Sequence, residues 1–204
     1  MEKSSFTSMC GGGDITGCRF SLSVMCGDYA DKILKAVGQV DTRKVWSGTD
    51  ALSTIYRGER VHVVDAARGF FVYANDRETH MIMEATFSKG CPGDADADYA
   101  LGCGDTRLNP TDQSFDVLGK ISFYPLGVPD YMEHIGHVVA MAREKNLYRA
   151  TSHYATELHG DVNALFAYFD EILAYAEQRI AHYVLQVTLS VNSPTKTQNR
   201  GNLS

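Results

Sequence analysis

Two stretches of the sequence combine hydroxyl, carboxylate and aromatic side chains within a few residues of one another. Carboxylates and hydroxyls accept hydrogen bonds from an amino group, hydroxyls donate to a ring nitrogen, and an aromatic ring offers a stacking surface. The combination indicates a site for a flat nitrogen heterocycle, with ordinary strand composition and a turn as the alternative. The candidates are Thr49, Asp50, Ser53, Thr54 and Tyr56 in the first stretch and His153, Tyr154, Thr156 and Glu157 in the second.

A second polar pattern lies near the end of each half of the chain, where polar residues alternate with apolar ones. The pattern predicts two strands, each with one buried face, whose polar faces are either ligand surfaces or solvated and partner-paired sheet surface. The polar positions are His80, Glu84, Thr86 and Ser88 in the first half and His182, Gln186, Thr188 and Ser190 in the second.

Catalytic and cofactor motifs are absent from the sequence. It contains no GxSxG, P-loop or HExxH pattern, and no nucleophile stands beside a candidate base. His134 and His137 lie three residues apart on a predicted helix, which indicates a solvated helix face rather than a metal clamp. We therefore expect a non-enzymatic protein with no catalytic residues, no metal and no cofactor.

Charge and cysteine content narrow the class further. The formal net charge is -6 and the basic residues are scattered, so the sequence argues against nucleic-acid binding. The five cysteines show no CxxC spacing, which argues against a disulfide framework or a zinc finger. With no long apolar run and no signal-peptide pattern at the start, a cytoplasmic location is expected and a membrane-embedded one is not.

The chain also repeats itself at an offset of about 102 residues. The offset aligns Asp28-Tyr29 with Asp130-Tyr131 and continues without a gap as far as Pro92 and Pro194. A period of this length indicates a duplicated domain rather than a solenoid.

Each copy shows the pattern strand, helix, strand, strand, helix, strand. Alternation predicts strands at 18–25 and 81–87, Asp28 is the expected N-cap of the first helix, and the stretch 45–56 is expected to hold two strands. Gly58 is expected to end them, and a helix is predicted over 59–77. The fold class is α+β, with two tandem ferredoxin-like βαββαβ domains and antiparallel sheets. The first spans 18–94, the second 116–196, and 95–115 connects them.

Several motifs together resemble a known family. They are the run from Lys44 to Gly58, Arg19-Phe20-Ser21-Leu22, the run from Thr86 to Asp94, the run from His153 to Leu158, and Asn192-Ser193-Pro194. In these the chain is similar, over nearly its whole length, to the YkoF-type family that binds thiamine or its hydroxymethylpyrimidine precursor (HMP). The resemblance implies tandem ferredoxin-like domains, a homodimer, one thiamine or HMP site per domain, and a role beside an uptake transporter for pyrimidine precursors.

The leading hypothesis is therefore non-enzymatic binding of thiamine or HMP. The alternatives are a small ferredoxin-like enzyme acting on a related heterocycle, and an RNA-binding βαββαβ module, which would need aromatic residues on basic central strands. Homodimerisation is expected through open sheet surface. The expected ligand-binding residues are Arg19, Phe20, Thr49, Asp50, Ser53, Thr54, Ser122, His153, Tyr154, Thr156 and Glu157.

Overall fold

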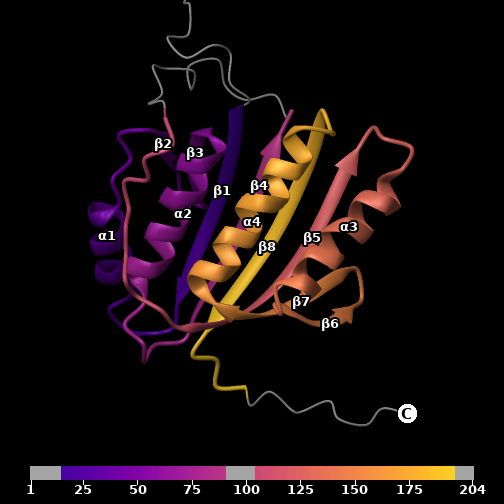
Figure 1. The fold of residues 1–204 in the computed structure, drawn as a ribbon. Helices are drawn as coiled ribbons and strands as arrows, with labels where there is room; N and C mark the ends of the chain where they lie inside the picture. Colours follow the sequence, from indigo (N-terminus) through magenta and orange to yellow (C-terminus); the bar gives the residue numbers. More distant parts are fainter. Residues whose placement is uncertain (1–14, 91–103, 196–204) are drawn as a thin grey trace, which may run out of the picture.

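The computed structural model describes residues 15–90 and 104–195, which form eight strands and four helices (Figure 1). The first half contains β1 (Ile15–Val24), α1 (Tyr29–Gln39), β2 (Trp46–Thr49), β3 (Thr54–Glu59), α2 (Arg60–Ala74) and β4 (Met81–Lys89). The second half contains β5 (Asp116–Leu126), α3 (Tyr131–Glu144), β6 (Tyr148–Ser152), β7 (Ala155–Asp161), α4 (Val162–Glu177) and β8 (His182–Val191). Both halves are ferredoxin-like βαββαβ units, as the sequence predicted.

The two units share one antiparallel sheet. The strand order is β2-β3-β1-β4-β8-β5-β7-β6, so the last strand of each unit pairs with the last strand of the other. Within that pairing Ala85 lies opposite Val187, and these two residues are also equivalent in the repeat, since 187 − 85 = 102. The β4–β8 junction is therefore an internal pseudo-twofold axis that passes through this pair of residues.

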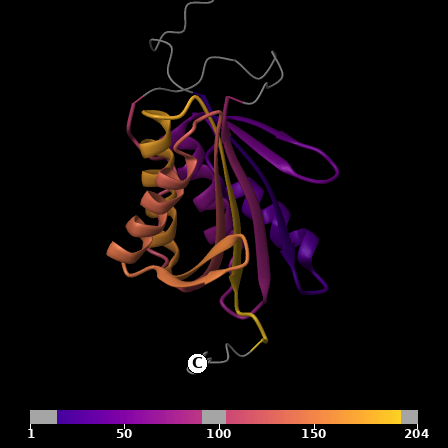
Figure 2. The same ribbon diagram turned by 90° about the vertical axis from the view of Figure 1, so that its right-hand side faces the viewer.

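All four helices cover one face of this sheet (Figures 1 and 2). Along each central strand the residues facing the helices are buried, as with Met81, Met83, Ala85 and Phe87 of β4. Helices α2 and α4 pack against each other above the junction, where the Phe71 and Phe166 rings lie 6.2 Å apart. The core is continuous across both units, and none of the described helices lies on the opposite face of the sheet.

One local prediction in the first unit was confirmed and one was wrong. Asp28 is the N-cap residue of α1, as predicted, although its carboxylate makes no cap hydrogen bond and instead contacts the Cys26 thiol and the Lys32 ammonium. Gly58 does not end the strand, because β3 runs to Glu59 and α2 begins at the next residue. A side chain at Gly58 would come within 3.2 Å of the Lys44 carbonyl oxygen, so this close approach accounts for the glycine.

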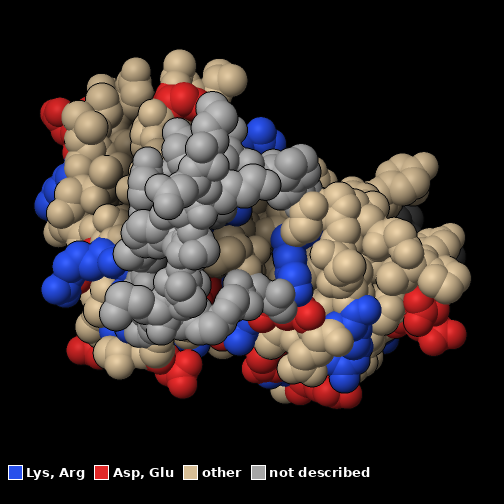
Figure 3. Space-filling model, turned by 90° about the horizontal axis from the view of Figure 1, so that it is seen from above, with Lys and Arg blue, Asp and Glu red and all other residues tan. Residues whose placement is uncertain are grey.

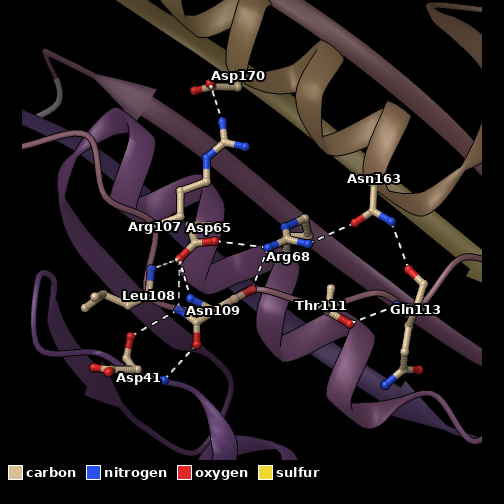
Figure 4. A network of polar contacts seen from close by, with 10 residues as sticks. All are labelled: Asp41, Asp65, Arg68, Arg107, Leu108, Asn109, Thr111, Gln113, Asn163 and Asp170. Carbon is tan, nitrogen blue, oxygen red and sulfur yellow. Dashed lines mark hydrogen bonds and ion pairs between the residues drawn. The ribbon is translucent and has the colours of Figure 1, made fainter.

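The described part of the connector, 104–115, is held to the helices by a polar network (Figure 4). The buried Asp65 carboxylate of α2 accepts hydrogen bonds from the Leu108 and Asn109 amide N–H groups, both at 2.9 Å. Arg68 donates to the Asn109 carbonyl at 2.6 Å and to the Asn163 side chain of α4 at 2.9 Å. The connector thus bridges α2 and α4, and its first part, within the undescribed range 91–103, lies outside the described residues.

Candidate functional site

Two cavities contain the residues of interest. We call the first the central cleft, because it lies over the pseudo-twofold axis on the face of the sheet without helices. Its volume is about 680 Å³, and its floor is built from residues that are equivalent in the two units. The equivalent pairs are Arg19 and Lys120, Ser21 and Ser122, Glu84 and Gln186, and Thr86 and Thr188.

The charged groups of the central cleft differ in how far they are already paired. The Lys120 ammonium lies 3.5 Å from the Glu157 carboxylate on the neighbouring strand. At the matching position opposite Arg19 the first unit has Ile55, so the guanidinium has no such carboxylate. The Asp50 carboxylate accepts hydrogen bonds from the amides of Leu52 and Ser53, which hold its pKa below the usual range.

The second cavity, which we call the α3 groove, lies at the edge of the second unit between α3 and the β6–β7 hairpin. Its volume is about 740 Å³, and among the described residues no charged side chain lines it. Its walls are aromatic and aliphatic with several hydroxyl groups. They are formed by Ile121 to Leu126 of β5, Tyr131, Met132, Ile135, Val138 and Val139 of α3, and Thr151, Ser152, Tyr154, Ala155 and Thr156 of the hairpin.

The floor of the α3 groove is an open strand edge. Strand β7 pairs with β5 only as far as the Ile121–Thr156 pair, whereas β8 pairs with β5 through Leu126. Within the described sheet, the stretch from Phe123 to Leu126 therefore has a neighbouring strand on one side only. Backbone groups at such an edge offer donors and acceptors in the plane of a flat ligand.

The hydroxyl groups of the hairpin are not all engaged. The Thr151 hydroxyl lies 2.9 Å from the Tyr148 hydroxyl, and Ser122 donates to the Tyr154 carbonyl at 2.8 Å. The Thr156 hydroxyl has no hydrogen-bonding partner among the described residues. Thr156 therefore contributes a free hydroxyl to a groove whose walls are mostly aromatic and aliphatic.

Tyr154 stands at the mouth of the groove with an unusual backbone. Its φ of 61° is in the left-handed region, which a tyrosine seldom adopts, and its side chain is 97% exposed. Strain of this kind is often retained at binding sites. Tyr154 therefore has both an unfavourable backbone conformation and an exposed aromatic ring beside the groove.

The first unit repeats the exposed apolar residues of this region. Tyr29 is 54% exposed and its counterpart Tyr131 is 50% exposed, while Leu52 stands in the position of Tyr154 and is also exposed. Exposed large apolar side chains that survive a duplication in pairs indicate a shared surface rather than scattered surface residues.

The structure divides the residues that the sequence analysis proposed for the first site. Arg19, Asp50 and Ser53 line the central cleft. Phe20 has a contact with the same cleft, but its ring is buried against Tyr56 and Phe70 in the core.

Thr49 and Thr54 do not line the central cleft. They face each other across the β2–β3 hairpin, with their hydroxyl oxygens 3.0 Å apart. They lie on the other side of the hairpin from Ile55, which does line the cleft. The predicted first site is therefore divided between the two sides of the hairpin.

The residues proposed for the second site are likewise divided. Tyr154 and Thr156 line the α3 groove, and Ser122 borders both cavities. Glu157 lies outside the groove, because it faces Lys120 across the β5–β7 pair. His153 is in the exposed turn of the hairpin and lines neither cavity.

The two histidines of α3 differ in exposure, because His137 is exposed and His134 is not. His134 is buried and its Nδ1 lies 2.8 Å from the Tyr175 hydroxyl, while the His137 ring stacks on the Tyr175 ring at 4.2 Å. The prediction of a solvated face is wrong for His134, because α4 presents Tyr175 to it. No group of potential metal ligands occurs among residues 15–90 and 104–195.

The distribution of charged side chains and the state of the described cysteines agree with what the sequence predicted. Basic and acidic side chains are interspersed on the surface shown in Figure 3. Of the described cysteines, Cys18 and Cys26 are both free, and burial raises the pKa of the Cys18 thiol well above its usual range. In the described part of the chain no helix is both long and apolar enough to cross a membrane.

Comparison with known proteins identifies the family. The YkoF-related family matches residues 15–94 and 116–196, so each unit matches separately, and the chain belongs to this family. It is 37% identical over 195 residues to YkoF of Bacillus subtilis (strain 168), a match that covers 94% of this chain and 98% of that protein. The name of that relative describes it, provisionally, as an HMP/thiamine-binding protein.

Sequence reasoning missed the helical wall of the α3 groove. Tyr131, Met132, Ile135 and Val139 were not proposed as site residues, although Tyr29 and Tyr131 matched in the repeat alignment. The repeat alignment could have revealed them, because a tyrosine occurs at the start of the first helix in both units. Hydrophobic periodicity alone assigns such residues to the core. Lys120 was also missed; it matches Arg19 at an offset of 101 residues, one residue shorter than the offset that relates the two units after Asp28.

Proposed function

We propose that the protein binds HMP or thiamine without transforming it, with the aminopyrimidine ring in the α3 groove. The observation that supports this site is its lining: aromatic and aliphatic walls, an open strand edge and hydroxyl groups, with no charged side chain. This combination suits a flat heterocycle, because the two faces of its ring pack against apolar groups, while its ring nitrogens and amino group form hydrogen bonds in the plane of the ring. The name of the Bacillus subtilis relative agrees with this ligand class.

We further propose one such site in each unit. The support is the paired exposure of Tyr29 with Tyr131 and of Leu52 with Tyr154. The two sites are expected to differ in affinity, because the first hairpin offers Leu52 where the second offers an aromatic ring, and because Thr49 and Thr54 already pair with each other.

A binding protein of this kind fits a role in uptake or salvage of pyrimidine precursors, in the cytoplasm and beside a transporter. A homodimer also remains part of the proposal. The sheet surface open to a second copy is smaller than the sequence suggested, because β4 and β8 pair with each other within one chain. Among the described strands, β2 and β6 are outermost, and the end of β5 has a neighbour on one side only. The sheet face without helices is the remaining surface for a second copy.

Isothermal titration calorimetry with HMP, thiamine and a pyrimidine without the amino group tests the site. HMP and thiamine are expected to bind, and the analogue without the amino group is expected to bind at least tenfold more weakly, because it leaves groove acceptors unpaired. Val139→Glu places a charge on the groove wall and is expected to abolish binding at this site.

The matched control is Gly136→Glu, which puts the same charge on the same helix, away from the groove, where an added Cβ meets nothing within 4 Å. If both variants bind HMP as the unmodified protein does, the ligand does not occupy the α3 groove.

A further inference from the structure

The α3 groove and the central cleft meet at one boundary. Three residues, Ile121, Ser122 and Ala155, line both cavities. Ser122 lies on β5 at this boundary, and its hydroxyl is fixed by donation to the Tyr154 carbonyl at 2.8 Å. The two cavities are therefore adjacent at Ser122.

The chemistry changes at that boundary. No described residue that lines the groove is charged, whereas the cleft is lined by one cation from each unit, Arg19 and Lys120, and by two carboxylates of the first unit, Asp50 and Glu84. Lys120 is two residues from Ser122 on the same strand and the same face, a separation of about 7 Å along the strand. A lysine side chain and the phosphorylated hydroxymethyl group of a ligand are together long enough to span this distance.

The cations of the cleft are available to a ligand to different extents. The Arg19 side chain makes no hydrogen bond or ion pair with a described residue. The carboxylate that influences it, Asp50, is already held by two amides of its own turn. Lys120 is 55% exposed and shares one ion pair with Glu157, so two of its three donors remain for a second acceptor.

We propose that the groove and the cleft form one bipartite site that prefers a phosphate monoester of the hydroxymethylpyrimidine to the free alcohol. The ring occupies the groove, and the phosphate occupies the cleft, where Lys120 and, across the junction, Arg19 bind it. Hydroxyls of the cleft floor, among them Thr188 directly opposite Lys120, complete the anion site. The ring half of this inference rests on the proposed function, and the phosphate half does not.

Calorimetric titration with HMP and with its phosphate ester tests the inference. The unmodified protein is expected to bind the ester about tenfold more tightly than HMP, the scale of one charge-assisted hydrogen bond. Lys120→Gln is expected to remove this difference and to leave the affinity for HMP unchanged. Lys35→Gln, an exposed lysine of α1 outside both cavities, is the matched control and is expected to change neither affinity.

A second variant separates loss of the cation from release of Glu157. Lys120→Gln with Glu157→Gln keeps the local charge balance, and it too is expected to bind the ester no more tightly than HMP. Equal affinity of the unmodified protein for HMP and its ester, or an undiminished preference in both variants, would overturn the inference and leave the proposed function standing. If neither compound binds, both proposals fail.

Discussion

The two units share an element order but hold their helices in different ways. Helix α4 buries only aromatic and aliphatic side chains, whereas α2 also buries His62 and Asp65. The matching positions in α4 are Ala164 and Ala167, since both are 102 residues further along. The duplication has therefore kept the backbone while the first unit came to depend on polar contacts with the connector and the second on apolar packing.

The hairpins differ in a parallel way. In the first unit Asp50 closes the turn by accepting hydrogen bonds from Leu52 and Ser53 at 2.7 and 2.8 Å. In the second unit the turn places Tyr154 in the left-handed region beside the α3 groove. Hydrogen bonds within the turn stabilise the first hairpin. In the second hairpin, an unfavourable backbone conformation occurs at Tyr154, the residue whose aromatic ring is exposed beside the groove.

The largest expected effect is on the polar network of the first unit. Asp65→Ala removes the acceptor for two connector amides and the Asn109 side chain, and leaves the half-buried Arg68 without its carboxylate. We expect the free energy of unfolding to fall by about 3 kcal/mol, the usual range for a broken buried charge network. Equilibrium denaturation in urea measures it.

The matched control for this prediction is Asp112→Ala. It removes an exposed carboxylate from the same connector and is expected to change stability by less than about 0.5 kcal/mol. Similar losses in the two variants would show that the connector, rather than its anchor on α2, determines stability, and the contrast between the units would lose its basis.

The helices and strands of each unit could be predicted from the sequence, but the pairing of the two units into one sheet could not. Alternation along Met81–Phe87 and Tyr183–Leu189 marks two strands with one apolar face each. The same alternation fits a strand whose edge faces solvent, another chain or its own repeat. The β4–β8 pairing is a contact between elements far apart in the sequence, so no local pattern contains it.

The candidate site was predictable in kind but not in composition. Hydroxyls and aromatics on the hairpins indicated a heterocycle site, and Tyr154 and Thr156 do line the groove. Glu157 was assigned to the same site because it is adjacent in sequence to Thr156. Successive residues of a strand face opposite sides, however, so one residue enters the groove and the next faces Lys120.

A smaller effect is expected from the threonines that occupy equivalent positions on β7 and β3. Thr156→Val removes a free hydroxyl of the groove while keeping the shape of the side chain, and is expected to weaken HMP binding about fivefold, as for one neutral hydrogen bond. Thr54→Val removes a hydroxyl that already pairs with Thr49, so less than a twofold change is expected. Calorimetry on both variants compares them, and equal losses would indicate that the two hairpins contribute alike.

The buried histidine of α2 predicts a pH dependence specific to the first unit. Burial, with Lys44 nearby, lowers the pKa of His62 below its ordinary value of about 6.5. The folded state therefore favours the neutral ring, so the contribution of His62 to stability is fully present above pH 6.5 and is lost as the pH falls toward the folded pKa. His62→Gln cannot titrate, so its free energy of unfolding is expected to vary less between pH 7.5 and 5.5, in urea titrations at each pH. An identical decline would assign the dependence to other groups.

The smallest expected effect separates stability from binding at Tyr154. A left-handed backbone costs a tyrosine about 1 kcal/mol and costs glycine nothing, but glycine also gains freedom in the unfolded chain. Tyr154→Gly is therefore expected to leave the free energy of unfolding unchanged or raise it by up to about 1 kcal/mol. The same change removes the aromatic face at the groove mouth and is expected to weaken HMP binding severalfold.

Leu52→Gly, at the equivalent place in the first hairpin, is the matched comparison. Leu52 does not have a positive φ, so this change relieves no strain and is expected only to destabilise. Urea denaturation gives the free energy of unfolding of each variant, and calorimetry gives its affinity for HMP. If Tyr154→Gly destabilises the protein as much as Leu52→Gly does, the tyrosine backbone is not strained. If it also binds HMP normally, the aromatic ring at the groove mouth has no part in recognition, and the two hairpins differ in sequence alone.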